Sequence, residues 1–196
     1  MKTKQRLLAF GMIILANIVG FNSMAQDTNE TGSSLSLGLP ALALIKTDAA
    51  PINLTLTTTV AGEMVAASVT NTAARIKVTS IIAGTGTRSI SGAVTAGTPP
   101  ANTYLKMTPI VNPAPNFVGT SGNVTAVEYD LTSGVAAGSK EIVTGIGSCY
   151  SGTTPTDGYA IKYEFGILNA GAFGDIRATA GAAMTVTFTI SDESVI

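Results

Sequence analysis

Residues 183–191 read Ala-Met-Thr-Val-Thr-Phe-Thr-Ile-Ser, and this stretch decides the fold class. Apolar residues at every second position, 184 to 190, alternate with hydroxyl residues between them. Because successive side chains of a β-strand point to opposite faces of the sheet, this period predicts a half-buried strand. A plain core strand is the favoured interpretation of the segment, and a role in assembly or in recognition during secretion is the alternative.

The same alternation recurs along the chain, in residues 52–57, 75–79, 104–108, 127–131 and 159–167. Glycine- and proline-rich turns separate these segments, and no apolar pattern of helical spacing is longer than two turns. Eight or nine short strands of this kind predict an all-β protein, an antiparallel β-sandwich of Greek-key or jelly-roll type. A closed barrel is the alternative. We expect one such domain, over residues 34–196.

The first 25 residues have the layout of a secretory signal peptide. Lys2, Lys4 and Arg6 precede a fifteen-residue apolar run over 7–21, and Ser23 and Ala25 provide the small residues of a cleavage site. The run is shorter than the ~20 residues that a transmembrane helix needs. We therefore expect cleavage, no membrane span in the mature chain, and export to the cell surface, the extracellular medium or the periplasm. The mature chain has eight basic and twelve acidic residues, a net charge of −4.

The composition excludes several classes of function. The 196 residues include no His and one Cys, so catalytic mechanisms and metal sites that depend on imidazole are absent. Cys149 cannot form an internal disulfide, and we expect it to be a buried small side chain, with a thiol that links two copies as the alternative. A chain without a basic cluster is also a poor candidate for nucleic-acid binding.

Few carboxylates are arranged as a catalytic or metal site would require. Glu128 and Asp130 would lie about 7 Å apart on one strand face, which suits a glycosidase pair but equally a solvated surface. The loop over 153–158 supplies a single carboxylate, Asp157, too few for calcium. The sequence therefore predicts no catalytic residue, no metal site and no cofactor, and a protein that is not an enzyme.

The mature N-terminus begins with a polar tail, 26–33, which we expect to be flexible. Apolar residues then alternate up to Pro40 and change parity after it, which fits a bulge or a strand that switches sheets. The favoured interpretation is the first strand of the sandwich. The alternative is a donor strand over 34–46 that inserts into a neighbouring copy. Its candidate inserting residues are Leu35, Leu37, Leu39, Leu42 and Leu44.

Three segments carry a resemblance to a known group: 141–152, with Ile-Val-Thr-Gly-Ile-Gly at its centre, 158–163 and 185–192. They resemble a group of uncharacterised exported all-β proteins of Bacteroidota, over most of the mature chain. This resemblance implies an exported β-sandwich and carries over no activity. In its Thr, Gly and Ala content the chain is also similar to fimbrial and pilus subunits. It departs from chaperone–usher pilins, which often have an internal disulfide that one Cys cannot form.

Two functional hypotheses follow from these observations. The first is an exported structural protein that self-associates as a homo-oligomer or polymer, in a pilus-like fibre or an extracellular layer. The low charge on the predicted strand faces favours it, because charge is the usual protection against edge-to-edge pairing. The second is a monomeric module that binds an extracellular glycan or protein, with Tyr104 and Tyr150 as the candidate ligand-facing rings.

Overall fold

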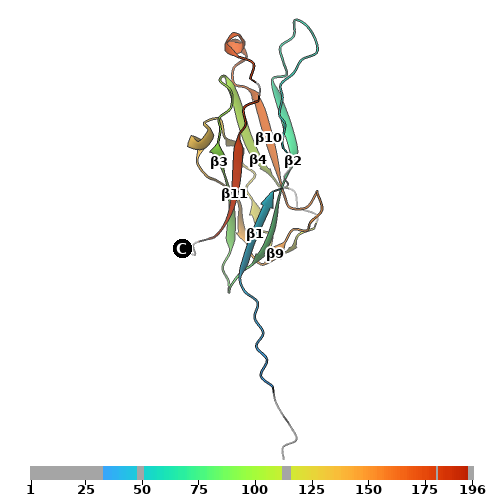
Figure 1. Ribbon diagram of the computed structural model, residues 1–196, viewed down its shortest axis with the longest axis vertical. Coiled ribbons are helices and arrows are strands. Elements are labelled where there is room, and N and C mark those ends of the chain that lie inside the picture. The colour runs from blue at the N-terminus through green and yellow to red at the C-terminus, as the bar shows by residue number, and fades with distance from the viewer. Residues whose placement is uncertain (1–32, 48–50, 112–115, 180, 194–196) are drawn as a thin grey trace, which may run out of the picture. The chain divides into compact units, whose positions relative to one another are not determined.

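The computed structural model describes residues 33–47, 51–111, 116–179 and 181–193 (Figure 1). The predicted signal peptide and the tail up to residue 32 lie outside the described residues. The chain divides into two units, Met1–Gly38 and Leu39–Ile196. In the first unit, the described residues 33–38 have no regular secondary structure. The second unit contains both sheets.

Two antiparallel sheets pack against each other in the second unit. The larger sheet contains β1 (Leu42–Thr47), β2 (Ser68–Ile81), β4 (Thr103–Ile110), β5 (Val118–Gly119), β7 (Tyr129–Asp130), β9 (Cys149–Tyr150) and β10 (Tyr159–Ile167). The smaller sheet has the order β11-β3-β8-β6, formed by β11 (Thr185–Asp192), β3 (Arg88–Ala96), β8 (Lys140–Ile146) and β6 (Asn123–Val124). Two short 3₁₀ turns, η1 (Gly134–Ala137) and η2 (Ala170–Asp175), are the helical elements of the described residues.

The predicted all-β sandwich is confirmed. Seven strands have six or more residues and four have two, so the strand count depends on how the short ones are treated. Apart from β1 and β2, no two strands that are consecutive in the described chain are neighbours in a sheet. The core lies between them and is formed by the inward residues of both, with Ile76, Met107 and Ile161 on one side and Ile90 and Ile142 on the other.

Strand β1 shows which side of the N-terminal segment faces the core. In its antiparallel register with β2, Ile45 lies opposite buried Val78, whereas Leu44 lies opposite Thr79 and Leu42 opposite Ile81. Paired residues share a face, so the inward face of β1 carries Ile45, and Leu42 and Leu44 lie on its outer face. The alternation fits both faces equally, and only the pairing with β2 decides between them.

Residues 52–57, predicted as a strand, form no ladder. At the end of the segment, Thr57 accepts a hydrogen bond from the backbone of Ala66 at 3.2 Å, a pairing of the same register as that of Thr47 with Ile76. The described residues 51–56 belong to no strand. Ile52 and Leu54 instead pack against the core. The alternation correctly predicted a half-buried segment. It does not predict whether the segment forms hydrogen bonds to a neighbouring strand.

Candidate assembly groove

The sandwich is open along one side, between β11 at the edge of the smaller sheet and the edge of the larger sheet where β1 pairs with β2. Strand β11 pairs with β3 on one edge, and within the described residues its other edge has no ladder partner. Facing it across the opening are residues 51–56 and the part of β2 before Ile76, where no β1 residue pairs. Strand β1 covers the remaining part of this edge of β2, opposite residues 76–81. An unpaired strand edge is a template for another strand.

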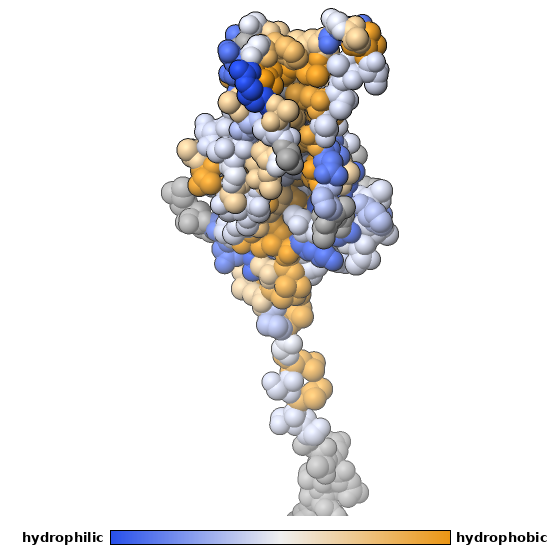
Figure 2. All heavy atoms as spheres, turned by 45° about the horizontal axis from the view of Figure 1, so that its top comes forward, coloured by the Kyte–Doolittle hydropathy of each residue, from blue (hydrophilic) through white to orange (hydrophobic). Residues whose placement is uncertain are grey.

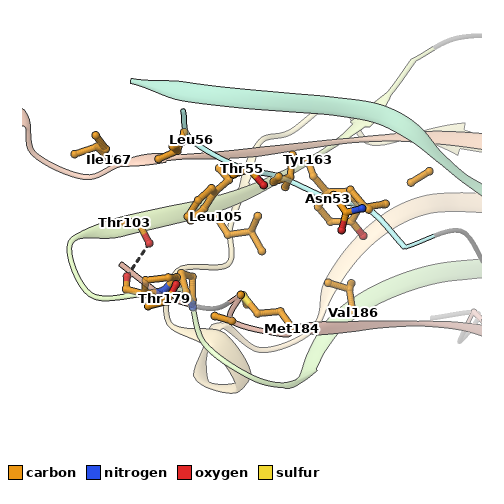
Figure 3. Close-up of a pocket in the computed structure, with 18 of the residues that line it drawn as sticks. Asn53, Thr55, Leu56, Thr103, Leu105, Tyr163, Ile167, Thr179, Met184 and Val186 are labelled. Atoms are coloured by element: carbon orange, nitrogen blue, oxygen red, sulfur yellow. Dashed lines mark hydrogen bonds between the residues drawn. The ribbon is translucent and has the colours of Figure 1, made fainter. Parts of the chain in front are cut away.

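This opening is a groove of about 1020 Å³. Apolar side chains (orange) gather along it between paler flanks in Figure 2. In the close-up of Figure 3, Leu105 and Tyr163 lie on one wall with Thr55 and Leu56, and Met184 and Val186 lie on the opposite wall. The apolar residues that line it include Ile52, Leu54, Leu56, Val65, Ala74, Ile76, Leu105, Phe165, Ile167, Phe173, Ile176, Met184, Val186 and Phe188.

Arg88 closes the sandwich at the β1 end of the groove. This buried side chain donates hydrogen bonds to the carbonyls of Leu42 and Ile81, to Ser80 Oγ at 2.9 Å and to Asp192 Oδ1 at 2.7 Å. One guanidinium therefore joins β1, β2 and β11. The sequence analysis did not single out Arg88, although it stands at the inward parity two residues before core residue Ile90.

These contacts fix the strand directions. Since Arg88 bonds both Leu42 and Asp192, the start of β1 and the end of β11 lie at the same end of the sandwich. Strands β2 and β11 therefore run in the same direction, and β1 runs between them in the opposite one (Figure 1). The open half of the groove lies at the other end, where Ile167 donates its backbone N–H to Ala67.

The five donor-strand candidates fall into two groups. Leu42 and Leu44 belong to β1, which pairs within its own chain. Leu35, Leu37 and Leu39 precede it and are 79–85% exposed. Only the latter group presents unpaired apolar side chains at alternate positions, so the structure narrows the candidate segment to residues 33–39.

Tyr104 and Tyr150 do not form a common ligand site. Tyr104 pairs with Gly166 of β10, and Gly166 in turn pairs with Ser68 of β2. Tyr150 pairs with Thr79, near the other end of β2. Eleven residues of strand separate the two levels, about 35 Å. The Tyr104 hydroxyl is also engaged, donating to Glu164 Oε1 at 2.8 Å. Tyr150 is half exposed.

The carboxylates considered for chemistry hold local structure. Glu128 forms an ion pair with Lys106 at 2.7 Å. Asp130 Oδ1 accepts the backbone N–H of Thr132 at 2.8 Å, and hydrogen bonding by Thr132 lowers the pKa of Asp130. Asp157 is buried and accepts hydrogen bonds from Asn116 and from the backbone of Thr154, and these lower its pKa. The Asp157 carboxylate thus holds the start of the 153–158 loop.

Three further expectations concern Cys149, metals and membranes. The thiol of Cys149 is buried, as predicted, and burial raises its pKa. No cluster of three or more Cys, Asp or Glu side chains that could hold a metal occurs among the described residues. Within the same part of the chain, no helix is long and apolar enough to cross a membrane.

Buried tyrosines predict a loss of stability at alkaline pH. Burial raises the pKa of Tyr159 and Tyr163 above the value near 10 of an unfolded chain. The unfolded state therefore loses its phenolic protons first as the pH rises. The stability that these groups contribute is complete below about pH 10 and is lost as the pH rises through their folded pKa values.

We expect the urea midpoint to be level from pH 7 to about 9.5 and to fall above it, and Tyr163→Phe to reduce that fall. Tyr163 is the informative position because it is buried on the wall of the groove. If the urea midpoint fell equally in Tyr163→Phe and in the wild type above about pH 9.5, ionisation of Tyr163 would not be a cause of the alkaline loss of stability.

No protein-family model, curated protein or solved structure matches this chain.

Proposed function

We propose that the protein is an exported, non-enzymatic structural subunit that self-associates by strand exchange. In this proposal, residues 33–39 of one copy lie along the outer edge of β11 in the groove of the next copy. The observation that supports it is the apolar groove beside an unpaired strand edge, in a chain with an exposed alternating segment. Main-chain hydrogen bonds would provide affinity, and pockets for alternate side chains would provide specificity.

The groove and the segment cannot meet within one molecule while β1 stays paired. Leu42 lies opposite Ile81, and the open half of the groove begins at Arg75, six residues or about 20 Å along β2. Leu39 is three residues before Leu42 and can lie at most about 11 Å from it. The three leucines therefore cannot enter the groove of their own chain together. A second copy has no such restriction.

The two ends of the exchange lie at opposite ends of the sandwich. The donor segment leaves β1 beside Arg88, whereas the groove opens at the end of β2 that carries Ser68. A contact between two different surfaces of the same protein is heterologous, and it continues from copy to copy unless a rotation closes a ring. The geometry thus favours a linear, head-to-tail array over a symmetric dimer.

The side chains of the segment suit the groove. Leucines at alternate positions recur about every 7 Å along a strand, the same repeat as Met184, Val186 and Phe188 on the groove wall. Burying a leucine side chain contributes about 1.5–3 kcal/mol. Three of them supply enough free energy to offset part of the cost of association.

The test is the oligomeric state of mature protein, residues 26–196, by light scattering and negative-stain electron microscopy. We expect the wild type to form filaments and the triple variant Leu35→Ser, Leu37→Ser, Leu39→Ser to stay monomeric. The matched control is Ser34→Ala with Ser36→Ala, which changes the opposite face of the same segment and should assemble. A triple variant that assembles like the wild type, or a wild type that stays monomeric at high concentration, contradicts the proposal.

A further inference from the structure

The mouth of the groove, its end beside Ser68, is surrounded by exposed apolar side chains. Loop 57–66 extends beyond the start of β2 at this end, and η2 lies beyond the end of β10, both at the top of Figure 1. Exposed apolar side chains that gather in one place mark an interaction surface more often than scattered ones do. Those at this end, 41–63% exposed, are Val60, Met64, Leu168 and Phe173, which we call the mouth rim.

Loop 57–66 is a hairpin that continues the pairing of β1 with β2. At its base Ala66 donates its backbone N–H to Thr57 at 3.2 Å, and at its tip Glu63 donates to Val60 at 3.3 Å. Both pairings keep the register of the β1–β2 ladder. From the first residue of β2 to Glu63 is five residues, about 16 Å along a strand. The loop therefore projects well past the mouth of the groove.

The proposed donor segment fills the groove up to its mouth. Residues 33–39 span about 20 Å as a strand, and the open half of the groove, from Ser68 to Arg75, spans about 23 Å. Leu39 must lie at the mouth, because the opposite direction would place the sandwich of the donor where β1 of the acceptor lies. The donor copy therefore continues directly outside the mouth.

The short connection to β1 brings the two sandwiches together. Leu42 is three residues after Leu39 and can lie at most about 11 Å from it. Its carbonyl accepts a hydrogen bond from Arg88, which fixes it to the sandwich of the donor. Since loop 57–66 of the acceptor projects about 16 Å, it extends past the point where the donor's sandwich begins. Strand exchange thus places the mouth rim against the second copy.

Resting on the proposed strand exchange, we infer that the mouth rim is a second contact surface of the assembly and docks on loop 82–87 of the copy that donates the strand. Loop 82–87 follows Ile81, which pairs with Leu42, so it lies where the donor segment leaves its sandwich. Its sequence, Ile-Ala-Gly-Thr-Gly-Thr, has no charged residue, and residues 83–85 are exposed. An uncharged loop suits an apolar rim, because no charge loses its hydration on contact.

The double variant Val60→Ser, Met64→Ser tests the rim in mature protein. Both side chains are exposed and neither lines the groove, so circular dichroism should show a wild-type fold. We expect the critical concentration for assembly to rise roughly tenfold, because two half-exposed apolar side chains are no longer buried on contact. The control Val127→Ser removes an equally exposed valine, two residues before β7 at the middle of β4. It should assemble within about twofold of the wild type.

Peptide binding shows whether the substitutions act at the rim or in the groove. A peptide of residues 26–39 enters the groove without a sandwich attached, so the rim has nothing to dock on. Its Kd, measured by isothermal titration calorimetry on the variant that lacks the three leucines, should be the same with and without the two rim substitutions. Weaker binding with them would mean that they disturb the groove itself, and the inference would be wrong.

Cross-linking tests where the rim docks. Val60→Cys and Thr85→Cys in one chain place one thiol on the rim and one on loop 82–87, while Cys149 is buried. In assembled filaments a short bismaleimide should join successive copies of this double variant into a ladder of covalent oligomers, and neither single variant should form one. Filaments of the double variant that give no ladder would overturn the docking on loop 82–87.

The outcomes separate this inference from the proposed function. If the wild type assembles through its leucines but the rim variant assembles equally well, the rim contact is wrong and strand exchange stands. If the wild type does not assemble, or does so without its leucines, the proposed function itself fails and the rim contact fails with it.

Discussion

Arg88→Met is expected to lower the free energy of unfolding by about 2–4 kcal/mol. Methionine fills a similar volume without a donor, so the substitution leaves the Leu42 and Ile81 carbonyls and Ser80 Oγ without the hydrogen bonds of Arg88. A buried polar group that loses its partner costs about 1–3 kcal/mol. The ion pair with Asp192 adds less, because the Asp192 side chain is 82% exposed. Urea denaturation followed by circular dichroism measures the change.

Arg177→Met is the matched control for this substitution. Arg177 is exposed, and within the described part of the chain it donates only to the nearby carbonyls of Gly174 and Ile176. Its replacement should change stability by no more than about 0.5 kcal/mol. If Arg88→Met lowers the free energy of unfolding no more than Arg177→Met does, the hydrogen bonds of Arg88 to β1, β2 and β11 do not stabilise the fold. The ladder between β1 and β2 would then hold β1 in place without Arg88.

Arg88 also bears on which part of the N-terminus is exchanged. The guanidinium holds the start of β1 to its own sandwich, so the exchanged segment must lie before Leu42. Loss of Arg88 should therefore loosen β1 itself and permit longer exchanges that include it. Variants weakened at this position should form less uniform assemblies than the wild type, which electron microscopy of the same samples can show.

The fold class was predictable because the residues of a strand that face the core are apolar, and they recur at every second position. The alternation over 184–190 became β11, with Val186, Phe188 and Ile190 packed against the core. The longest such pattern, over 159–167, became β10 in the centre of the larger sheet. Period two records which residues face a core, and it does so whatever the partner strand is.

The groove was not predictable, because it depends on contacts that no local pattern records. Residues 52–57 alternate as clearly as β11 does, yet 51–56 make no ladder and line an opening. Likewise, only the pairing of Ile45 with Val78 shows that Leu44 faces outward. Alternation predicts that a segment is half buried, whereas register and edge pairing depend on residues tens of positions away.

A synthetic peptide of residues 26–39 is expected to stabilise the Leu35→Ser, Leu37→Ser, Leu39→Ser variant. This variant keeps the groove but lacks the leucines of a donor, so the peptide can fill the groove without starting a polymer. A ligand at a hundred times its Kd stabilises a protein by about 2.7 kcal/mol. For a domain of this size that corresponds to a rise in Tm of roughly 5–10 °C. Differential scanning calorimetry across a peptide titration measures it.

Two controls make this result specific to strand addition. A peptide in which the three leucines are Ser should give no shift, because it keeps the charge of Asp27 and Glu30 but not the apolar face. Amide exchange should slow at backbone N–H groups of β11, whose outer edge has no ladder partner among the residues that the structure describes. Equal shifts with both peptides would mean that the leucines do not enter the groove. A shift without protection of β11 would place the peptide on another surface, so the two measurements together decide whether this edge is the acceptor.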